Sequence, residues 1–166
     1  MRLVDRILAE LQAESAATRR LLERLPEDKL GWKPHPKSMS LGALANHVAT
    51  IPAVIAEMAV PDVQELVRSD AWPAPAKQDV LANHDKSLQR ATEILGGFDD
   101  AQLQVTWKLM KGGQEVMSLP RAGLLRAVLL NHLYHHRGQL SVYLRLLDVP
   151  LPSTYGPSAD EPFGSK

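Results

Sequence analysis

Cysteine does not occur among the 166 residues of the chain. Disulfides, a cysteine nucleophile and thiolate ligands for a metal are therefore excluded. An excess of charge of one sign is also missing, because 19 lysines and arginines balance 19 aspartates and glutamates. Nucleic acids are bound through clustered cations, so the sequence predicts no nucleic-acid partner.

Long apolar segments are also scarce. The first residues, MRLVDRILAELQAE, carry charges throughout and do not resemble the apolar segment of a secretory signal. No apolar run of 18 residues suggests a membrane span. We therefore expect a cytoplasmic protein with no membrane partner. The length favours one domain that is large enough to bury a core.

The dominant pattern in the chain is helical periodicity. Apolar and small residues alternate at spacings of three and four before Pro26, which predicts a first amphipathic helix of about six turns. Pro52 lies within the second predicted helix and should kink it or leave one carbonyl unpaired. The later helices are predicted over residues 41–59 after the N-cap Ser40, 77–95 before two glycines, and 120–148.

The connecting segments complete the expected fold. Residues 60–76 are long enough to cross the length of a helix, so the second and third helices can run parallel. Residues 104–117 alternate partly and turn at a pair of glycines, which predicts a small β-hairpin. The sequence therefore predicts an all-α four-helix bundle over residues 1–150, with a hairpin before the last helix and an extended tail over 151–166.

The histidines carry the chemical signal. His132 and His136 are one helical turn apart, so their Cβ atoms should lie about 5–6 Å apart on one face. Two imidazoles at this spacing can bind one metal ion at about 2.0–2.1 Å. His47 interrupts the apolar face of the second helix in the same way. Three core-facing histidines from two helices indicate a metal site, with a hydrogen-bonded histidine cluster as the alternative.

Other common sites lack their motifs. The sequence HLYHH in the last helix lacks the glutamate of the HExxH zinc proteases. No carboxylate is placed beside the histidine pair for a di-iron centre. Neither a glycine-rich nucleotide loop nor a GxSxG elbow occurs. A nucleotide-binding or serine-hydrolase site is therefore not expected.

The segment NHLYHHRGQ at residues 131–139 resembles the HxxHHRGQ signature of the DinB/YfiT-like metalloenzymes. The resemblance implies an up-down-down-up four-helix bundle with a divalent metal held by His47, His132 and His136. Related proteins bind nickel, zinc or iron and are often dimers. Characterised relatives include thiol-dependent S-transferases and a mycothiol-dependent isomerase. The similarity also includes residues 25–30, 32–36, 38–42 and 155–161.

Three neutral histidines leave at least one coordination position open, as catalytic metal sites require. A metal there lowers the pKa of bound water and favours a bound thiolate. We therefore expect a divalent-metal-dependent hydrolase, or an S-transferase that uses an external low-molecular-weight thiol, acting on a small-molecule substrate. The alternative is a non-catalytic metal-binding or sensing protein, and a homodimer is expected in either case.

Four further residues are candidates for the pocket, although none is assigned a catalytic role. His135 could act as a base or bond to a neighbouring helix, and Gln139 shares a face with the metal ligands. His84 lies on the core face of the third helix, and Tyr155 reaches the pocket if the tail folds back. Arg137 points away from the ligands and is expected to anchor the tail or a partner subunit.

Overall fold

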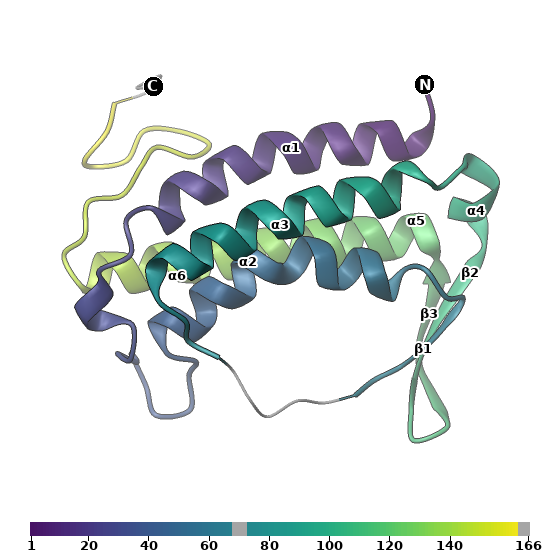
Figure 1. Cartoon of the computed structure of the whole chain (residues 1–166), viewed down its shortest axis with the longest axis horizontal. Coiled ribbons are helices and arrows are strands. Elements are labelled where there is room, and N and C mark those ends of the chain that lie inside the picture. The colour runs from purple at the N-terminus through teal and green to yellow at the C-terminus, as the bar shows by residue number, and fades with distance from the viewer. Residues whose placement is uncertain (68–72, 163–166) are drawn as a thin grey trace.

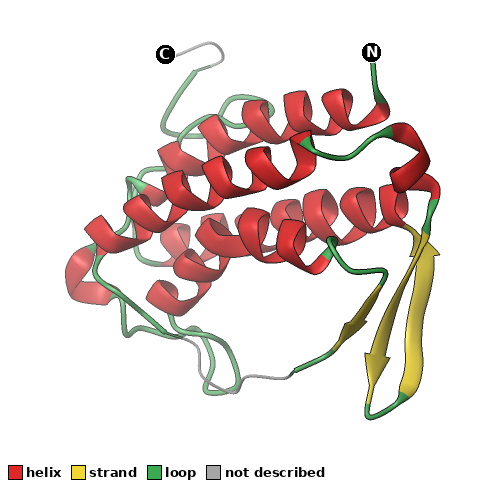
Figure 2. Cartoon of the chain, turned by 45° about the vertical axis from the view of Figure 1, so that its right-hand side comes forward, coloured by secondary structure: helices red, strands yellow, loops and turns green. Residues whose placement is uncertain are grey.

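The chain is mostly helical, with its long helices packed side by side and a small sheet at one end (Figures 1 and 2). The structure is a computed structural model that describes residues 1–67 and 73–162. A π-helical turn over Leu125–Leu130 joins α5 and α6 into one continuous helical stretch. The α-helices are α1 (Leu3–Leu22), α2 (Leu41–Met58), α3 (Lys77–Gly96), α4 (Asp100–Gln104), α5 (Arg121–Leu124) and α6 (Asn131–Leu146).

The core helix is α2, which packs against α3 and α6. As predicted, Ser40 caps it, because the hydroxyl oxygen accepts a hydrogen bond from the Ala43 amide at 3.2 Å. Its length and mean hydropathy of 1.3 would by themselves suffice to cross a membrane. However, 67% of this helix is buried inside the fold, as the central helix of a packed core should be.

Pro52 interrupts α2 without ending it. The Ser87 hydroxyl on α3 donates to the Thr50 carbonyl at 3.2 Å and accepts from the Ala53 amide at 2.9 Å. A proline removes one backbone donor and displaces the preceding turn. The hydroxyl of Ser87 therefore satisfies backbone groups on both sides of Pro52.

The sheet has the strand order β1-β2-β3. β2 and β3 are antiparallel, which confirms the predicted hairpin. Gly112 and Gly113 form its turn with φ of +57° and +79°, a backbone conformation that favours glycine. β1 pairs in parallel with β2 and was not predicted, because three residues carry too little pattern. The strands span Val63–Glu65 (β1), Thr106–Lys111 (β2) and Gln114–Pro120 (β3).

Two buried side chains tie the sheet and the last helical stretch to the end of α2. The indole N–H of Trp107 donates to the Met58 carbonyl at 2.9 Å. The guanidinium of Arg121 donates to the Ala59 carbonyl at 2.7 Å and pairs with Asp62. The starting position of the helix that carries two of the predicted ligands is thereby fixed.

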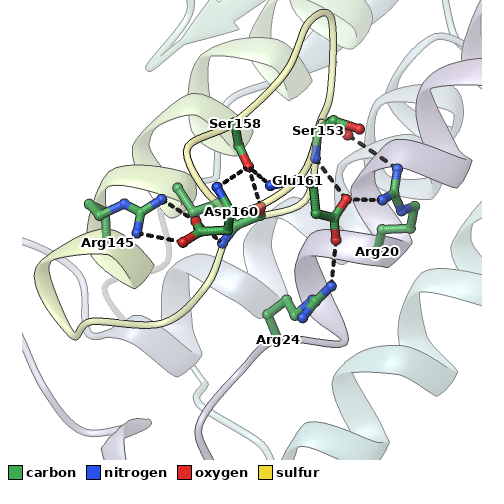
Figure 3. Close-up of polar contacts among 8 residues, drawn as sticks. Arg20, Arg24, Arg145, Ser153, Ser158, Asp160 and Glu161 are labelled. Carbon is green, nitrogen blue, oxygen red and sulfur yellow. Dashed lines mark hydrogen bonds and ion pairs between the residues drawn. The ribbon is translucent and has the colours of Figure 1, made fainter. Parts of the chain in front are cut away.

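The tail folds back and is bound by ion pairs to α1 and α6 (Figure 3). Glu161 accepts from Arg24 at 2.7 Å and also from Arg20, both on or just after α1. Asp160 pairs with Arg145 of α6, and this contact lowers the pKa of its carboxyl group. The tail is therefore docked as far as the structure describes it.

Candidate metal centre

The three histidines predicted as ligands converge at one point between α2 and α6. Nε2 of His132 lies 2.8 Å from Nε2 of His136 and 3.4 Å from Nε2 of His47. One nitrogen of each ring lies within 4.8 Å of a nitrogen of both others. In a tetrahedral site with bonds of 2.0–2.1 Å, ligand nitrogens are about 3.3–3.4 Å apart. Small side-chain movements would therefore bring all three onto one divalent ion.

The π-helical turn Leu125–Leu130 directly precedes the ligand pair on α6. An extra residue in one turn rotates everything that follows about the helix axis, and such turns are frequent at functional sites. This rotation determines the side of α6 on which His132 and His136 lie relative to α5. The sequence did not predict this turn, because the apolar periodicity reads as one regular helix.

Burial keeps the imidazoles neutral. It lowers the pKa of His47 to about 4, with a smaller contribution from His136 and His132. Burial likewise lowers the pKa of His132 to about 4, helped by His136 and His135, and it lowers the pKa of His136. Metal binding requires the unprotonated ring nitrogen. The histidines therefore offer lone pairs throughout the neutral pH range.

We expect metal occupancy to change little between about pH 8 and pH 6 and to fall steeply toward pH 4, since proton competition begins only near the lowered pKa values. Lowering the pH also destabilises the metal-free fold. Between 6.5 and about 4 the unfolded chain binds protons that the folded chain does not, so the free energy of unfolding decreases as pH falls. Equilibrium dialysis followed by metal analysis measures the occupancy. Loss of the metal already between pH 8 and pH 6 would contradict the neutral ligand set.

Gln139 contacts one of the predicted ligands. Its side-chain oxygen lies 2.7 Å from Nδ1 of His136. With the oxygen in this position, the ring proton is on Nδ1 and the lone pair of Nε2 faces the other two histidines. The prediction that Gln139 shares the ligand face and can orient a ligand agrees with this contact.

Substitution of Gln139 by alanine should weaken metal affinity by about 10–100-fold, because a ligand that loses its hydrogen-bonded partner is less well oriented. Competition with a chromophoric chelator measures the change. Gln89→Ala is the matched control, since Gln89 is also a helical glutamine whose amide contacts a side chain, Glu93, at 3.0 Å. Equal affinities of the two variants would show that Gln139 does not support the site.

The other pocket candidates lie in three different places. The ring of exposed His135 contacts that of His136, with centroids 4.8 Å apart, but does not belong to the converging group. His84 lies between α1 and α3, where Nε2 is 2.9 Å from the Ser15 hydroxyl, so it belongs to a separate polar contact. Tyr155 anchors the tail. Among the described residues, it forms no hydrogen bond or ring contact with any of the three histidines.

Arg137 turns to the opposite side of α6 from the ligands. Its side chain is only 5% exposed and pairs with Glu14 of α1 at 2.6 Å. It also donates to the Tyr155 hydroxyl, and its guanidinium lies over the rings of Tyr134 and Tyr155 at 5.5 and 5.1 Å. The prediction that Arg137 anchors the tail is confirmed.

Comparison with known proteins supports the fold described above. The sequence profile of the DinB family matches residues 1–163. The Bacillus subtilis protein YrdA, itself uncharacterized, is 27% identical over 160 residues, which cover 95% of this chain and 91% of YrdA. A DinB-like protein from Bacillus cereus superposes with a TM-score of 0.69 at 22% identity, over 90% of this chain and 95% of that one. Another from Bacillus subtilis gives 0.67 at 20% identity, over 89% and 96%.

Proposed function

The chain belongs to the DinB family, and on that basis we propose that it is a divalent-metal-dependent enzyme whose ion is held by His47, His132 and His136. The observation that supports this proposal is the convergence of one nitrogen from each of three rings to within 4.8 Å. The donor set fits nickel, zinc or iron, since imidazole suits all of these metals. Closed structural zinc sites have four protein ligands, whereas three leave room for a substrate.

When bound, a divalent ion would supply an open position at which the pKa of a water or thiol is lowered. The chain's own residues prepare that position. Burial keeps His47 and His132 unprotonated, and Gln139 holds the ring of His136. Because the chain has no cysteine, a thiol nucleophile has to come from an external low-molecular-weight thiol. We therefore propose S-transfer from such a thiol, or hydrolysis if water is the nucleophile.

The activity is tested by incubating metal-loaded protein with bacillithiol, mycothiol or glutathione and an aryl halide electrophile, and separately with ester and amide substrates. Product formation that requires both the metal and an intact His132 would support the proposal. Stoichiometric metal without turnover in any of these assays would favour a non-catalytic metal-binding or sensing protein.

We further propose that the helices form the up-down-down-up bundle of this family, since α2 and α3 begin at the same end of the molecule (Figure 1), and that the protein is a cytoplasmic homodimer. The dimer is supported by Val142 and Leu146, which lie one turn apart on α6 and are 57% and 59% exposed. Sedimentation equilibrium tests the dimer, and a monomer at micromolar concentration would contradict it.

A further inference from the structure

The segment between α1 and α2 lines a surface pocket that does not include the three converging histidines. The pocket has a volume of about 250 Å³, and its lining includes Lys33, Lys37, Ser38, Ser40 and Ala43. We call it the lysine pocket. It lies within the stretch WKPHPKSMSLG, which has no role in the metal centre described above.

Two observations place the segment that lines the lysine pocket beside the two helices that carry the histidines. On α2, Ala43 lines the pocket and His47 follows one helical turn later, about 6 Å along the axis. On the facing helix, Tyr143 packs edge-on against Trp32, the residue before Lys33, with ring centroids 5.7 Å apart. Tyr143 comes seven residues after His136, which is about 10 Å along α6.

Backbone contacts hold this segment in place. The amide of Leu41 donates to the Trp32 carbonyl at 2.8 Å, and the amide of Gly42 donates to the Leu30 carbonyl at 2.8 Å. A Cβ at Gly42 would lie only 3.1 Å from Cβ of Leu30, so glycine permits this close approach. The first amides of α2 are therefore already bonded, and any ligand of the pocket has to be held by side chains.

The turn that carries the lysines has its own hydrogen bonds. The amide of Lys37 donates to Nδ1 of His35 at 3.1 Å, and the amide of Ser38 donates to the His35 carbonyl at 2.9 Å. Binding sites of this kind are usually preformed, which reduces the entropy lost when a ligand binds.

The charge of the lysine pocket is positive and uncompensated. Neither Lys33 nor Lys37 forms an ion pair with any residue that the structure describes, whereas Lys29 in the same segment pairs with Asp28 at 3.1 Å. Two ammonium groups beside a concave surface raise the local concentration of anions. An anionic group bound there would lie one to two helical turns from the three histidines.

We propose that the lysine pocket binds the carboxylate or phosphate group of the substrate while the reacting atom lies at the histidines. This inference rests on the proposed metal-dependent function and adds the substrate class to it. The substrate is a small organic acid or phosphate ester whose anionic group and reacting atom are roughly 6–10 Å apart, on the order of the axial rise from Ala43 to His47 on α2 and from His136 to Tyr143 on α6.

The first test uses metal-free protein, so it does not depend on the metal. Sodium acetate and sodium phosphate are titrated at constant ionic strength while the backbone amide chemical shifts of residues 38–43 are followed. Saturable shifts are expected with one anion or both, which also shows whether carboxylate or phosphate is preferred.

The double variant Lys33→Gln/Lys37→Gln should bind at least about tenfold more weakly, because hydrogen bonds to charged groups are lost. Lys86→Gln/Lys111→Gln, which removes the same charge from exposed positions on α3 and β2, should bind normally. Equal binding by both double variants, or no saturable shift in the unaltered protein, would overturn the proposal.

The second test uses protein loaded with Co²⁺, in which the paramagnetic ion shortens the phosphorus relaxation time of bound phosphate by an amount that depends on distance. A distance of roughly 6–10 Å between the ion and phosphorus is expected from the helical rise. Direct coordination of phosphate, or a distance well beyond this range, would contradict the link between the lysine pocket and the metal centre. Failure to load Co²⁺ would instead contradict the proposed function, independently of the anion titration.

Discussion

Replacement of His132 by alanine is expected to weaken metal binding by at least about 100-fold. Structural zinc sites with four ligands are worth about 10–16 kcal/mol, so one ligand contributes about 2.5–4 kcal/mol. Nε2 of His132 lies 2.8 Å from that of His136 and 3.4 Å from that of His47. Isothermal titration with nickel or zinc measures the loss in protein produced without an affinity tag.

His135→Ala is the matched control, because His135 is also on α6 but is exposed and outside the converging group. This variant should retain full metal content. If the His135 variant lost the metal while the His132 variant kept it, the assignment of the ligands would be wrong.

Replacement of Arg137 by methionine should lower the free energy of unfolding by about 3–5 kcal/mol, because removal of one partner leaves a buried charge unpaired. The Glu14 side chain is 15% exposed and would lose an ion pair of 2.6 Å. The contact to Tyr155 would disappear as well. Urea denaturation of the metal-free protein measures the change without a contribution from the metal.

Arg126→Met serves as the control, since Arg126 forms an exposed ion pair with Glu10 at 3.1 Å. Its cost should stay below about 1 kcal/mol, as is usual for exposed pairs. The double variant Glu14→Gln/Arg137→Met should recover part of the loss, because the unpaired charge is removed. Equal costs for Arg126 and Arg137 would show that burial does not make the inner pair important.

The two predictions concern His132 and Arg137, which lie five residues apart on different sides of one helix. His136 faces α2 and the other ligands, whereas Arg137 faces α1 and the tail. The short segment HHRGQ therefore contributes both to the proposed metal centre, through its second histidine and the glutamine, and to the attachment of the C-terminal tail, through its arginine.

Local patterns were sufficient to predict the long helices, the Ser40 cap and the hairpin turn. They also indicated that His47, His132 and His136 could meet, because histidines one turn apart on an apolar face are informative in themselves, and the three rings do converge. The up-down-down-up order and the dimer stay predictions. The pairing of β1 with β2 was not predictable, since it depends on a partner distant in the sequence.

Other features depend on three-dimensional packing. The π-helical turn before His132 leaves no trace in the apolar spacing. The hydrogen bonds to the α2 backbone on either side of Pro52 come from Ser87 of another helix. His84 lies on the core face of α3 as expected, but that face meets Ser15 of α1 rather than the metal ligands. Periodicity indicates that a face is buried without showing which neighbour covers it.

Anomalous X-ray diffraction from crystals of the protein loaded with nickel or zinc, collected on both sides of the metal absorption edge, tests the central claim most directly. We expect one strong anomalous peak between α2 and α6, with His47, His132 and His136 each contributing one nitrogen at about 2.0–2.1 Å and at least one further position filled by solvent. A peak ligated by other residues, or full coordination by protein side chains alone, would contradict a catalytic centre built from these three histidines.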